Sequence, residues 1–324
     1  MRLGFGLTLL VISCVAQADD WRRASWDVMG TRAHVEFLAP AETDPVPELK
    51  AELERLNALL SPWVEDSELA QVNRRAAEEA VTISEEFYRL LEESNRFNEL
   101  SQGAFDITFA SAGHLYDYRE KKAPDAEQLE EATQHIDQGK LELLPDRRVR
   151  FAESGMRIDL GGIAKGHAID RCITLLRKAG VEHAWVSLGG DSYVLGRRDG
   201  RPWQVGIRHP RNQGEVALRV PVSDVAVSTS GDYQRSFLRD GERIHHIIEP
   251  ATGQSAGELA SVSVIADRAL EADALSTAIF VLGVDQGLAL ANRLDNVSAV
   301  LIDRSGQVHY SDDLAPGSSS AAGG

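Results

Sequence analysis

A glycine-rich segment, DLGGIAKGHAID (159–170), places a lysine where a helix is expected to begin. The backbone N–H groups at a helix start bind phosphate, and a cation there is unfavourable unless an anion lies nearby. The segment departs from the dinucleotide fingerprint because Gly161 and Gly162 are adjacent, and from the Walker pattern because His167 replaces its lysine. Two interpretations stay open: Lys165 meets a bound phosphate, or the glycines let the helix and the strand pack closely while Lys165 points to water.

The segment ALEADALSTAIF (269–280) offers oxygen ligands for a metal ion. Asp273 and Thr277 are four residues apart at the start of an apolar helix, so their side chains project from one face. A carboxylate and a hydroxyl at this spacing suit Mg²⁺, which completes its coordination with waters and substrate phosphates. The alternative, which this segment alone favours, is that Asp273 caps the helix while Thr277 bonds back to the preceding turn.

Two adjacent histidines begin the segment HHIIEPATG (245–253), next to a turn. An imidazole at a strand end can accept a proton or position a ligand near neutral pH. Because side chains alternate along a strand, only one of His245 and His246 faces any given site. A zinc site would need more ligands than these two residues offer.

The segment SQGAFDITF (101–109) places Phe105 and Asp106 directly after a glycine and an alanine, where an ordinary turn is the alternative to a ligand-binding loop. The chain contains no G-x-S-x-G elbow. The sequence therefore gives no support to a Ser-His-Asp hydrolase.

The whole chain of 324 residues has a formal net charge of −16 and a pI near 5.0. This charge excludes sequence-independent binding to nucleic acid, because a phosphate backbone favours clustered Lys and Arg. An anionic ligand must therefore meet a few local cations, a helix N-terminus or a metal ion. The length suffices for one large domain or two ordinary ones, with a core that needs no disulfide.

The first residues, MRLGFGLTLLVISCVAQADD, have the composition of an export signal: one arginine, an apolar run and an A-x-A cleavage site. We expect a signal peptide over 1–18 and a mature protein in the periplasm. The stretch ending at Cys14 also matches a lipobox, which would leave a lipidated Cys14 anchored to the inner membrane. Simple cleavage is favoured because thirteen residues before the cysteine are few for such a signal. Residues 314–324 are predicted to be a flexible tail.

The apolar pattern predicts helices and strands that alternate without a strict repeat. Expected helices cover 47–60, 84–101, the stretch from the glycine turn to 179, and 273–282. Expected strands cover 26–37, 156–160, 184–188, 203–207, 217–222, 225–229, 244–248 and 261–266. The polar stretch 119–131 is the best candidate for a boundary or an exposed excursion. The order mixes hairpins with one β-α-β unit, which favours an α+β domain.

Taken together, these segments resemble the ApbE family, the FAD:protein FMN transferases of the bacterial envelope. The resemblance rests on MGT (29–31), LSPWVEDSELAQVN (60–73), GAFDITF (103–109), DLGGIAKGHAID (159–170), SLGGD (187–191), STSGDYQRSF (228–237), HHIIEPATG (245–253) and ADALSTAIFVLG (272–283). Several separated motifs in one order are far more specific than any one of them.

The resemblance implies an α+β fold over residues 19–313, with mixed or antiparallel sheets and packed helices of the T-fold type. It implies an FAD cleft between two subdomains, with Mg²⁺ on the pyrophosphate. The implied reaction transfers the FMN half of FAD to a threonine or serine hydroxyl of a target protein through a phosphoester and releases AMP. The implied targets are flavin-carrying subunits of NADH:quinone or Rnf-type electron-transport complexes, or related envelope redox proteins.

The resemblance also assigns site residues. The metal ligands would be Asp273, Thr277 and the carbonyl of Gly162, with Ser276 as an adjunct. The FAD contacts would be Met29, Trp63, Ala104, Phe105, Asp106, Asp159, Lys165, His246 and Ile247. Trp63 stands where relatives often have tyrosine, and the position of Lys165 carries an acid in some members.

The catalytic candidates are Lys165, His246 and Asp106. Lys165 and Mg²⁺ would neutralise the pyrophosphate. The general base would be His246, whose unperturbed pKa suits proton uptake near neutrality, with His245 and Asp106 as alternatives. Two other functions stay open. One is a Mg²⁺-dependent FAD pyrophosphatase in which water replaces the threonine, and the other is a non-catalytic envelope FAD-binding protein, against which the Asp273–Thr277 pair argues.

Overall fold

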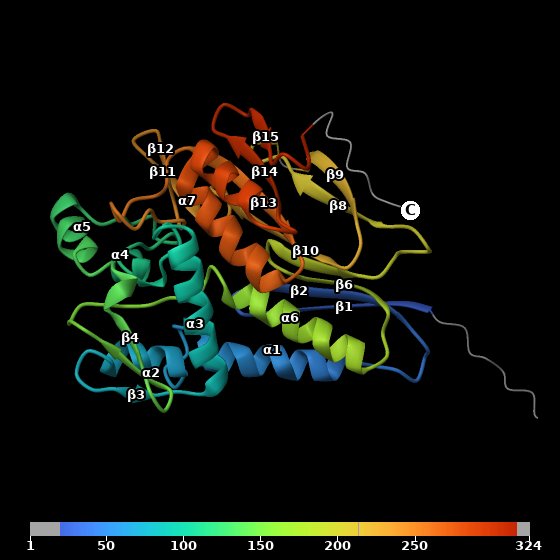
Figure 1. The fold of residues 1–324 in the computed structure, drawn as a ribbon, viewed down its shortest axis with the longest axis horizontal. Coiled ribbons are helices and arrows are strands. Elements are labelled where there is room, and N and C mark those ends of the chain that lie inside the picture. The colour runs from blue at the N-terminus through green and yellow to red at the C-terminus, as the bar shows by residue number, and fades with distance from the viewer. Residues whose placement is uncertain (1–19, 213, 316–324) are drawn as a thin grey trace, which may run out of the picture.

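The fold is described from a computed structural model for residues 20–212 and 214–315. The expected signal peptide over 1–18, Cys14, and the part of the expected tail from residue 316 onward lie outside these residues. The described residues form an α+β fold with antiparallel sheets, as predicted, in which helices cover one face of a large sheet (Figure 1).

The large sheet has eight strands, and every neighbouring pair in it is antiparallel. In sheet order they are β1 (Asp20–Val28), β2 (Thr31–Ala39), β6 (His183–Leu188), β7 (Asp191–Leu195), β10 (Val225–Gly231), β13 (Leu259–Ala266), β14 (Ser298–Asp303) and β15 (Val308–Tyr310). All eight residues of β13 are buried. This central strand therefore forms part of the core on both of its faces.

Three helices, α1 (Val46–Leu60), α6 (Ala164–Lys178) and α7 (Ala269–Arg293), make the layer on the sheet. In α1, leucines recur at helical spacing and are buried, as the apolar pattern predicted: Leu49, Leu53, Leu56 and Leu60. By length and composition α7 could cross a membrane, but it packs against β10, β13 and β14. It is therefore a core helix of this fold.

A smaller unit follows α1 in the chain and lies beside the α1–α6 layer (Figure 1). Its helices are α2 (Glu68–Arg75), α3 (Glu85–Leu100), α4 (Ala110–Gly113) and α5 (Ala126–Thr133), with short 3₁₀ helices η1 (Ile107–Phe109) and η2 (Gln138–Lys140). Its sheet has the order β3 (Val81–Thr82), β5 (Arg148–Phe151), β4 (Leu141–Leu144). As predicted, the hydroxyl of Ser84 caps α3, where it accepts a hydrogen bond from the N–H of Phe87.

Two antiparallel hairpins stand apart from these sheets. The first pairs β8 (Trp203–Arg208) with β9 (Val216–Val222), and the second pairs β11 (Ser236–Arg239) with β12 (Glu242–His245). The second hairpin lies between β10 and the histidine segment. It therefore links two of the motifs identified in the sequence, STSGDYQRSF (228–237) and HHIIEPATG (245–253).

The predicted strand over 156–160 is wrong, and with it the predicted β-α-β unit. This segment is extended but belongs to no sheet. The N–H and C=O of Ile158 bond to the side chain of Asn73, on α2, at 2.8 and 2.9 Å. The N–H of Arg157 bonds to the hydroxyl of Ser111, and that of Asp159 to the carbonyl of Ile107. Two side chains and one backbone carbonyl from outside any sheet thus satisfy backbone groups that a neighbouring strand would otherwise pair.

Other boundaries also differ from expectation. The single strand expected over 26–37 is the hairpin β1–β2, whose turn holds Met29 and Gly30 at positive φ. The helix expected over 273–282 is the longer α7, and the strand expected over 244–248 ends with β12 at His245. The stretch 119–131, which was predicted as a boundary or an exposed excursion, contains the start of α5, where Asp125 forms a capping box.

Candidate active site

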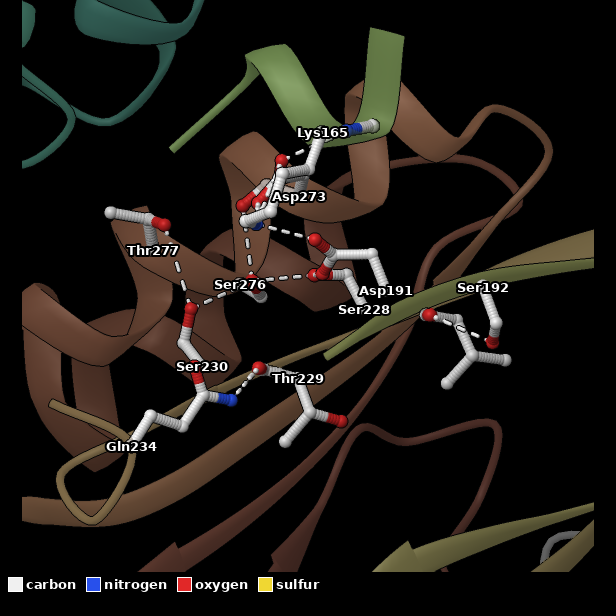
Figure 2. A network of polar contacts seen from close by, with 12 residues as sticks. Lys165, Asp191, Ser192, Ser228, Thr229, Ser230, Gln234, Asp273, Ser276 and Thr277 are labelled. Atoms are coloured by element: carbon white, nitrogen blue, oxygen red, sulfur yellow. Dashed lines mark hydrogen bonds and ion pairs between the residues drawn. The ribbon is translucent and has the colours of Figure 1, made fainter. Parts of the chain in front are cut away.

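Lys165, in the first turn of α6, pairs with two carboxylates. Its Nζ atom bonds to Asp191 Oδ2, at the start of β7, and lies 3.2 Å from Oδ1 of Asp273, on α7. Asp273 also accepts a 3.0 Å hydrogen bond from the backbone N–H of Gly166. Figure 2 shows these side chains converging between the helices and the sheet. The interpretation in which Lys165 only faces solvent is therefore wrong.

Two glycines between β6 and β7 bring Asp191 to this point. Gly189 has a φ of +66°, in the left-handed region that favours glycine. A Cβ atom on Gly190 would lie 2.8 Å from the carbonyl oxygen of Thr229, so this turn packs directly on β10. Asp191 consequently enters β7 buried beneath the start of α6, where Lys165 compensates its charge.

The start of α7 is fixed by residues of α6. Asp170 accepts hydrogen bonds from the N–H groups of Ala269 and Leu270, at 2.8 and 3.1 Å. A Cβ atom on Gly166 would lie 2.2 Å from the carbonyl oxygen of Ala269, so only glycine allows this helix crossing. The close packing at Gly166 is between two helices, and not between the helix and a strand as considered from the sequence. The capping role considered for Asp273 is wrong, because Asp170 supplies the acceptors at this helix start.

A row of hydroxyl groups runs from Asp191 along the contact between β10 and α7 (Figure 2). Ser228 donates to Asp191 and lies 3.1 Å from the hydroxyl of Ser276. The hydroxyl of Ser230 lies 2.9 Å from Ser276 and 3.5 Å from Thr277. The row connects the buried carboxylates to Thr277 through polar contacts alone.

The three residues expected to bind Mg²⁺ border this row. A Cβ atom on Gly162 would lie 3.2 Å from Oγ1 of Thr277 and 3.2 Å from the ring of Phe105. Within the described residues the hydroxyl of Thr277 has only the 3.5 Å contact with Ser230, so the back-bonding alternative does not hold. A carboxylate, a hydroxyl and a carbonyl are oxygen donors of the kind that Mg²⁺ prefers.

The electrostatics of Asp273 also fit a cation. Burial and the neighbouring Asp191 raise the pKa of Asp273, and Lys165 opposes this rise. A divalent cation would favour the ionised carboxylate in the same way as Lys165. Among residues 20–212 and 214–315, no three His, Cys, Asp or Glu side chains form a ready ligand group. A metal ion here would therefore depend on hydroxyl, backbone and ligand oxygens.

Asp106 has a structural role at the start of η1. Its Oδ1 atom accepts from the N–H of Thr108 at 2.7 Å and from the hydroxyl of the same residue, while Oδ2 accepts from the N–H of Gln138 at 3.1 Å. Burial raises the pKa of Asp106, and these hydrogen bonds oppose the rise. Because both oxygens already hold the loop, Asp106 is a poor candidate for the general base.

An open pocket of about 370 Å³ lies beside Asp106. It brings together two of the predicted motifs, because Gly103 and Asp106 line it with Pro250 and Ala251. The remaining lining residues are Asn98, Gln134, Ile136, Asp137, Gln138 and Lys140. Its volume lies within the range of about 300–1,000 Å³ that is typical of small-molecule sites.

The two histidines have different environments, as strand alternation predicts. His245 is fully buried against Phe280, and its Nε2 atom lies 2.9 Å from the carbonyl oxygen of Ala256. The Nδ1 atom of His246 is buried and has no hydrogen-bond partner in the described part of the chain. Burial, followed by the charge of Arg235, lowers the pKa of His246 to about 3. The unperturbed pKa expected for this residue is therefore wrong, and its imidazole is neutral at pH 7.

The remaining predicted FAD contacts lie in several different parts of the fold. Asp159 accepts a 2.6 Å hydrogen bond from the N–H of Gly161, which fixes the glycine turn. Met29 lies in the β1–β2 turn, Ala104 lies in the turn after α3, and Ile247 is buried in the core. Trp63 lies in the α1–α2 loop with 91% of its surface exposed, and no aromatic neighbour is recorded for it within residues 20–212 and 214–315.

The family model described as "ApbE family" matches residues 29–301 of this sequence, which include every residue of the site described above. The chain belongs to the ApbE family. Among curated relatives, the FAD:protein FMN transferase of Treponema pallidum is 36% identical, with 89% of this chain and 85% of the relative covered. That of Haemophilus influenzae is 31% identical, with 86% of each chain covered.

Solved ApbE structures share the fold. The ApbE protein of Thermotoga maritima superposes with a TM-score of 0.83 at 31% identity, covering 90% of this chain and 97% of that one. The apo flavinyl transferase ApbE of Pseudomonas stutzeri gives a TM-score of 0.81 at 31% identity, covering 91% and 95%.

Several residues of this ApbE site had no role assigned from sequence. Asp191 and Ser228 belong to the quoted segments SLGGD and STSGDYQRSF, but nothing in either segment states which residue pairs with Lys165. The available signal was a lone acid after two glycines at the end of an apolar strand. Arg235, from the second segment, was also missed, although it influences both His246 and Asp159.

Proposed function

We propose that this ApbE-family protein is an FAD:protein FMN transferase, which moves the FMN moiety of FAD to a threonine or serine hydroxyl of a target protein. The observation that carries the proposal is the convergence of Asp273, Thr277 and Gly162 beside the buried Lys165–Asp191 pair. The relatives named for this activity align with most of the chain.

The proposed reaction is a transfer at the FMN-side phosphorus. The hydroxyl oxygen of the target forms a bond to that phosphorus, and the bond from the phosphorus to the bridging oxygen breaks. AMP leaves with the bonding electron pair, and the hydroxyl proton passes to a base. Such a transfer depends on positioning and on neutralisation of phosphate charge more than on covalent chemistry by the protein.

We propose that Asp273, the hydroxyl of Thr277 and the carbonyl of Gly162 hold Mg²⁺. Bound there, the ion would supply positive charge to the pyrophosphate oxygens. Lys165 and the N–H of Gly166 orient the Asp273 carboxylate by limiting rotation about its side-chain bonds. The hydroxyl of Ser276, which donates to the carbonyl of Asp273 at 3.0 Å, supports the same helical turn.

We propose that FAD extends from the Thr277 region towards the pocket beside Asp106, in a cleft between the large sheet layer and the smaller unit. Phe105 supports this path. Its ring lies against Gly162, and the next residue in the chain, Asp106, lines the pocket. Trp63 offers an exposed aromatic face on which a flavin ring can stack. Met29, Ala104, Asp159, Lys165, His246 and Ile247 remain predicted FAD contacts.

His246 is the proposed acceptor of the hydroxyl proton. Its Nδ1 atom is buried without a partner in the described residues, whereas both oxygens of Asp106 are occupied. The Nδ1 atom of His245 also lacks a partner there, but the Nε2 atom of that ring is held by the carbonyl of Ala256 in the core. A neutral imidazole has a free lone pair at pH 7. The low pKa makes it a weak base, so it would act as the proton leaves in the transition state.

The location and the targets are proposals from sequence. The apolar leader supports export to the periplasm, with or without lipidation of Cys14, and the targets would be flavin-carrying subunits of NADH:quinone or Rnf-type complexes. Mass spectrometry of the mature N-terminus separates cleavage after residue 18 from a lipidated Cys14.

The function is tested with purified protein, FAD, Mg²⁺ and a flavin-subunit domain that contains an acceptor threonine. The expected result is a target heavier by one FMN moiety and one AMP released per transfer, with both products lost in EDTA. Release of FMN and AMP at the same rate without any target would indicate the pyrophosphatase instead. FAD binding with neither product would indicate a non-catalytic flavin-binding protein.

A further inference from the structure

Arg235 is a cation beside the candidate site that forms no ion pair with a carboxylate among the described residues, although its charge acts on Asp159. Lys165 lies between Asp191 and Asp273, so these three groups together carry a net negative charge when both acids are ionised. Arg235 is exposed, and its guanidinium has no hydrogen bond or ion pair with any residue that the structure describes. A pyrophosphate brought to this site needs positive charge that Lys165 alone does not provide.

The side chain of Arg235 lies among residues that border the proposed FAD site. Its Nη2 atom would be 3.8 Å from a Cβ atom on Gly30, in the turn that holds Met29. Its carbonyl oxygen accepts a 3.2 Å hydrogen bond from the N–H of His246. Burial raises the pKa of Asp159, and Arg235 is the nearby cation that opposes the rise.

The turn before Arg235 is anchored next to the hydroxyl row. Gln234 donates a 3.2 Å hydrogen bond to the carbonyl of Thr229, the residue before Ser230 in β10 (Figure 2). Ser230 in turn contacts Thr277. The backbone that carries the guanidinium is thus held by the side chain of Gln234, which bonds to β10, and by the N–H of His246 at the carbonyl of Arg235 itself.

We propose that Arg235 binds the pyrophosphate of FAD and is the principal free cation of this site, while Lys165 serves to position Asp273. A guanidinium donates two parallel hydrogen bonds to phosphate oxygens and keeps its charge at any working pH. Because negative charge moves to the leaving phosphate during transfer, the same contact stabilises the transition state. This inference rests on the proposed function for the identity of the ligand.

The test measures binding as well as turnover. With Arg235→Ala, the dissociation constant for FAD is expected to rise about 10- to 100-fold, as for loss of a charged hydrogen bond. The constant for riboflavin, which has no phosphate, is expected to stay unchanged. Arg235→Lys should recover part of the FAD affinity but not the two-bond geometry. Arg239→Ala removes an exposed arginine from the neighbouring strand β11 and serves as the matched control.

The outcomes separate this inference from the proposed function. Equal loss of FAD and riboflavin binding, or unchanged FAD binding in Arg235→Ala, would overturn the phosphate contact even where the wild type transfers FMN. A selective loss of FAD affinity would support the contact even where the wild type fails to modify a target. A similar loss in Arg239→Ala would overturn the specific role, because it would indicate general attraction by surface charge.

Discussion

Asp170 of α6 accepts a 2.8 Å hydrogen bond from the N–H of Ala269, the first residue of α7. This contact fixes the position of the first turn of α7 relative to α6. With α7 fixed at its first residue, Asp273 lies one turn further along, opposite the N–H of Gly166 and the side chain of Lys165. The candidate site is therefore assembled by a helix cap that comes from a different helix.

Asp170→Ala is expected to lower both stability and ligand affinity. Loss of an acceptor at a helix start costs about 0.5–2 kcal/mol of unfolding free energy. A shift of the start of α7 would also displace Asp273 and Thr277, which this helix carries. The matched control is Asp125→Ala, which removes the cap of α5, a helix outside the Lys165–Asp273 cluster. Urea unfolding should show a loss in both variants, whereas FAD titration should show weaker binding only in Asp170→Ala. Equal FAD affinity in the two would contradict the link between cap and site.

Asp273→Asn tests the proposed metal ligand with little change in volume. We expect Mg²⁺-dependent FAD binding and FMN transfer to fall by at least about 10-fold, because an amide is a weaker ligand than a carboxylate. Isothermal titration with Mg²⁺ and FAD, in the presence and absence of EDTA, gives the comparison. Ser276→Ala, one turn away on the same helix, removes a hydroxyl next to the site and should affect Mg²⁺ dependence far less. An unchanged EDTA response in Asp273→Asn would remove this residue from the ligand set.

Acid stability is expected to depend on an ion-pair network between α1, α3 and α6. The hydrogen bond from His167, at 2.9 Å, and the pairing with Arg55 hold the pKa of Glu86 at about 2 against an ordinary value of 4.5, although burial opposes them. Because the folded state binds fewer protons, this stabilisation is complete above pH 4.5 and is lost as the pH falls towards 2.

Glu86→Gln should therefore flatten the fall in unfolding free energy between pH 5 and pH 2. Glu85→Gln changes the same charge at a neighbouring side chain that is 60% exposed and, among the described residues, forms an ion pair with Arg89 alone, so the wild-type slope should persist. Chemical denaturation at a series of pH values measures both slopes. Identical slopes for Glu86→Gln and the wild type would exclude the network as a source of acid sensitivity.

The sequence predicted the segments of the site better than the contacts within them. Apolar spacing identified α1 and α3, because these helices bury one face against the core. Helical spacing, a local property, placed Asp273 and Thr277 on one face of a helix, but on its own it favoured a capping role for Asp273, and the proposed metal role came from the family resemblance. Asp191, one of the two carboxylates that pair with Lys165, was not found, because it is 26 residues away and reaches Lys165 only through the fold of β6 and β7. The strand expected at 156–160 failed for the same reason: Asn73, a distant side chain, bonds to its backbone.

Transfer activity should distinguish the two adjacent histidines. His246→Gln keeps a polar side chain of similar size but removes the imidazole base, and we expect the rate of FMN transfer to fall about 10²- to 10⁴-fold with little change in FAD affinity. His245→Gln is the matched control, since it alters the buried residue that bonds to Ala256, and it should reduce stability more than the rate.

The pH dependence sharpens this comparison. Burial lowers the pKa of His246 from 6.5 to about 3, so the imidazole stays neutral as the pH falls through 6.5. The rate of the wild type should therefore not fall as the pH is lowered through 6.5. Any fall in rate that is caused by protonation of His246 should begin well below pH 5. Rate measurements under single-turnover conditions from pH 5 to 9, on wild type and variant, test this. A wild-type inflection near pH 6.5 that disappears in the variant would mean that His246 is solvated in the working enzyme, and a variant with full activity would exclude it as the base.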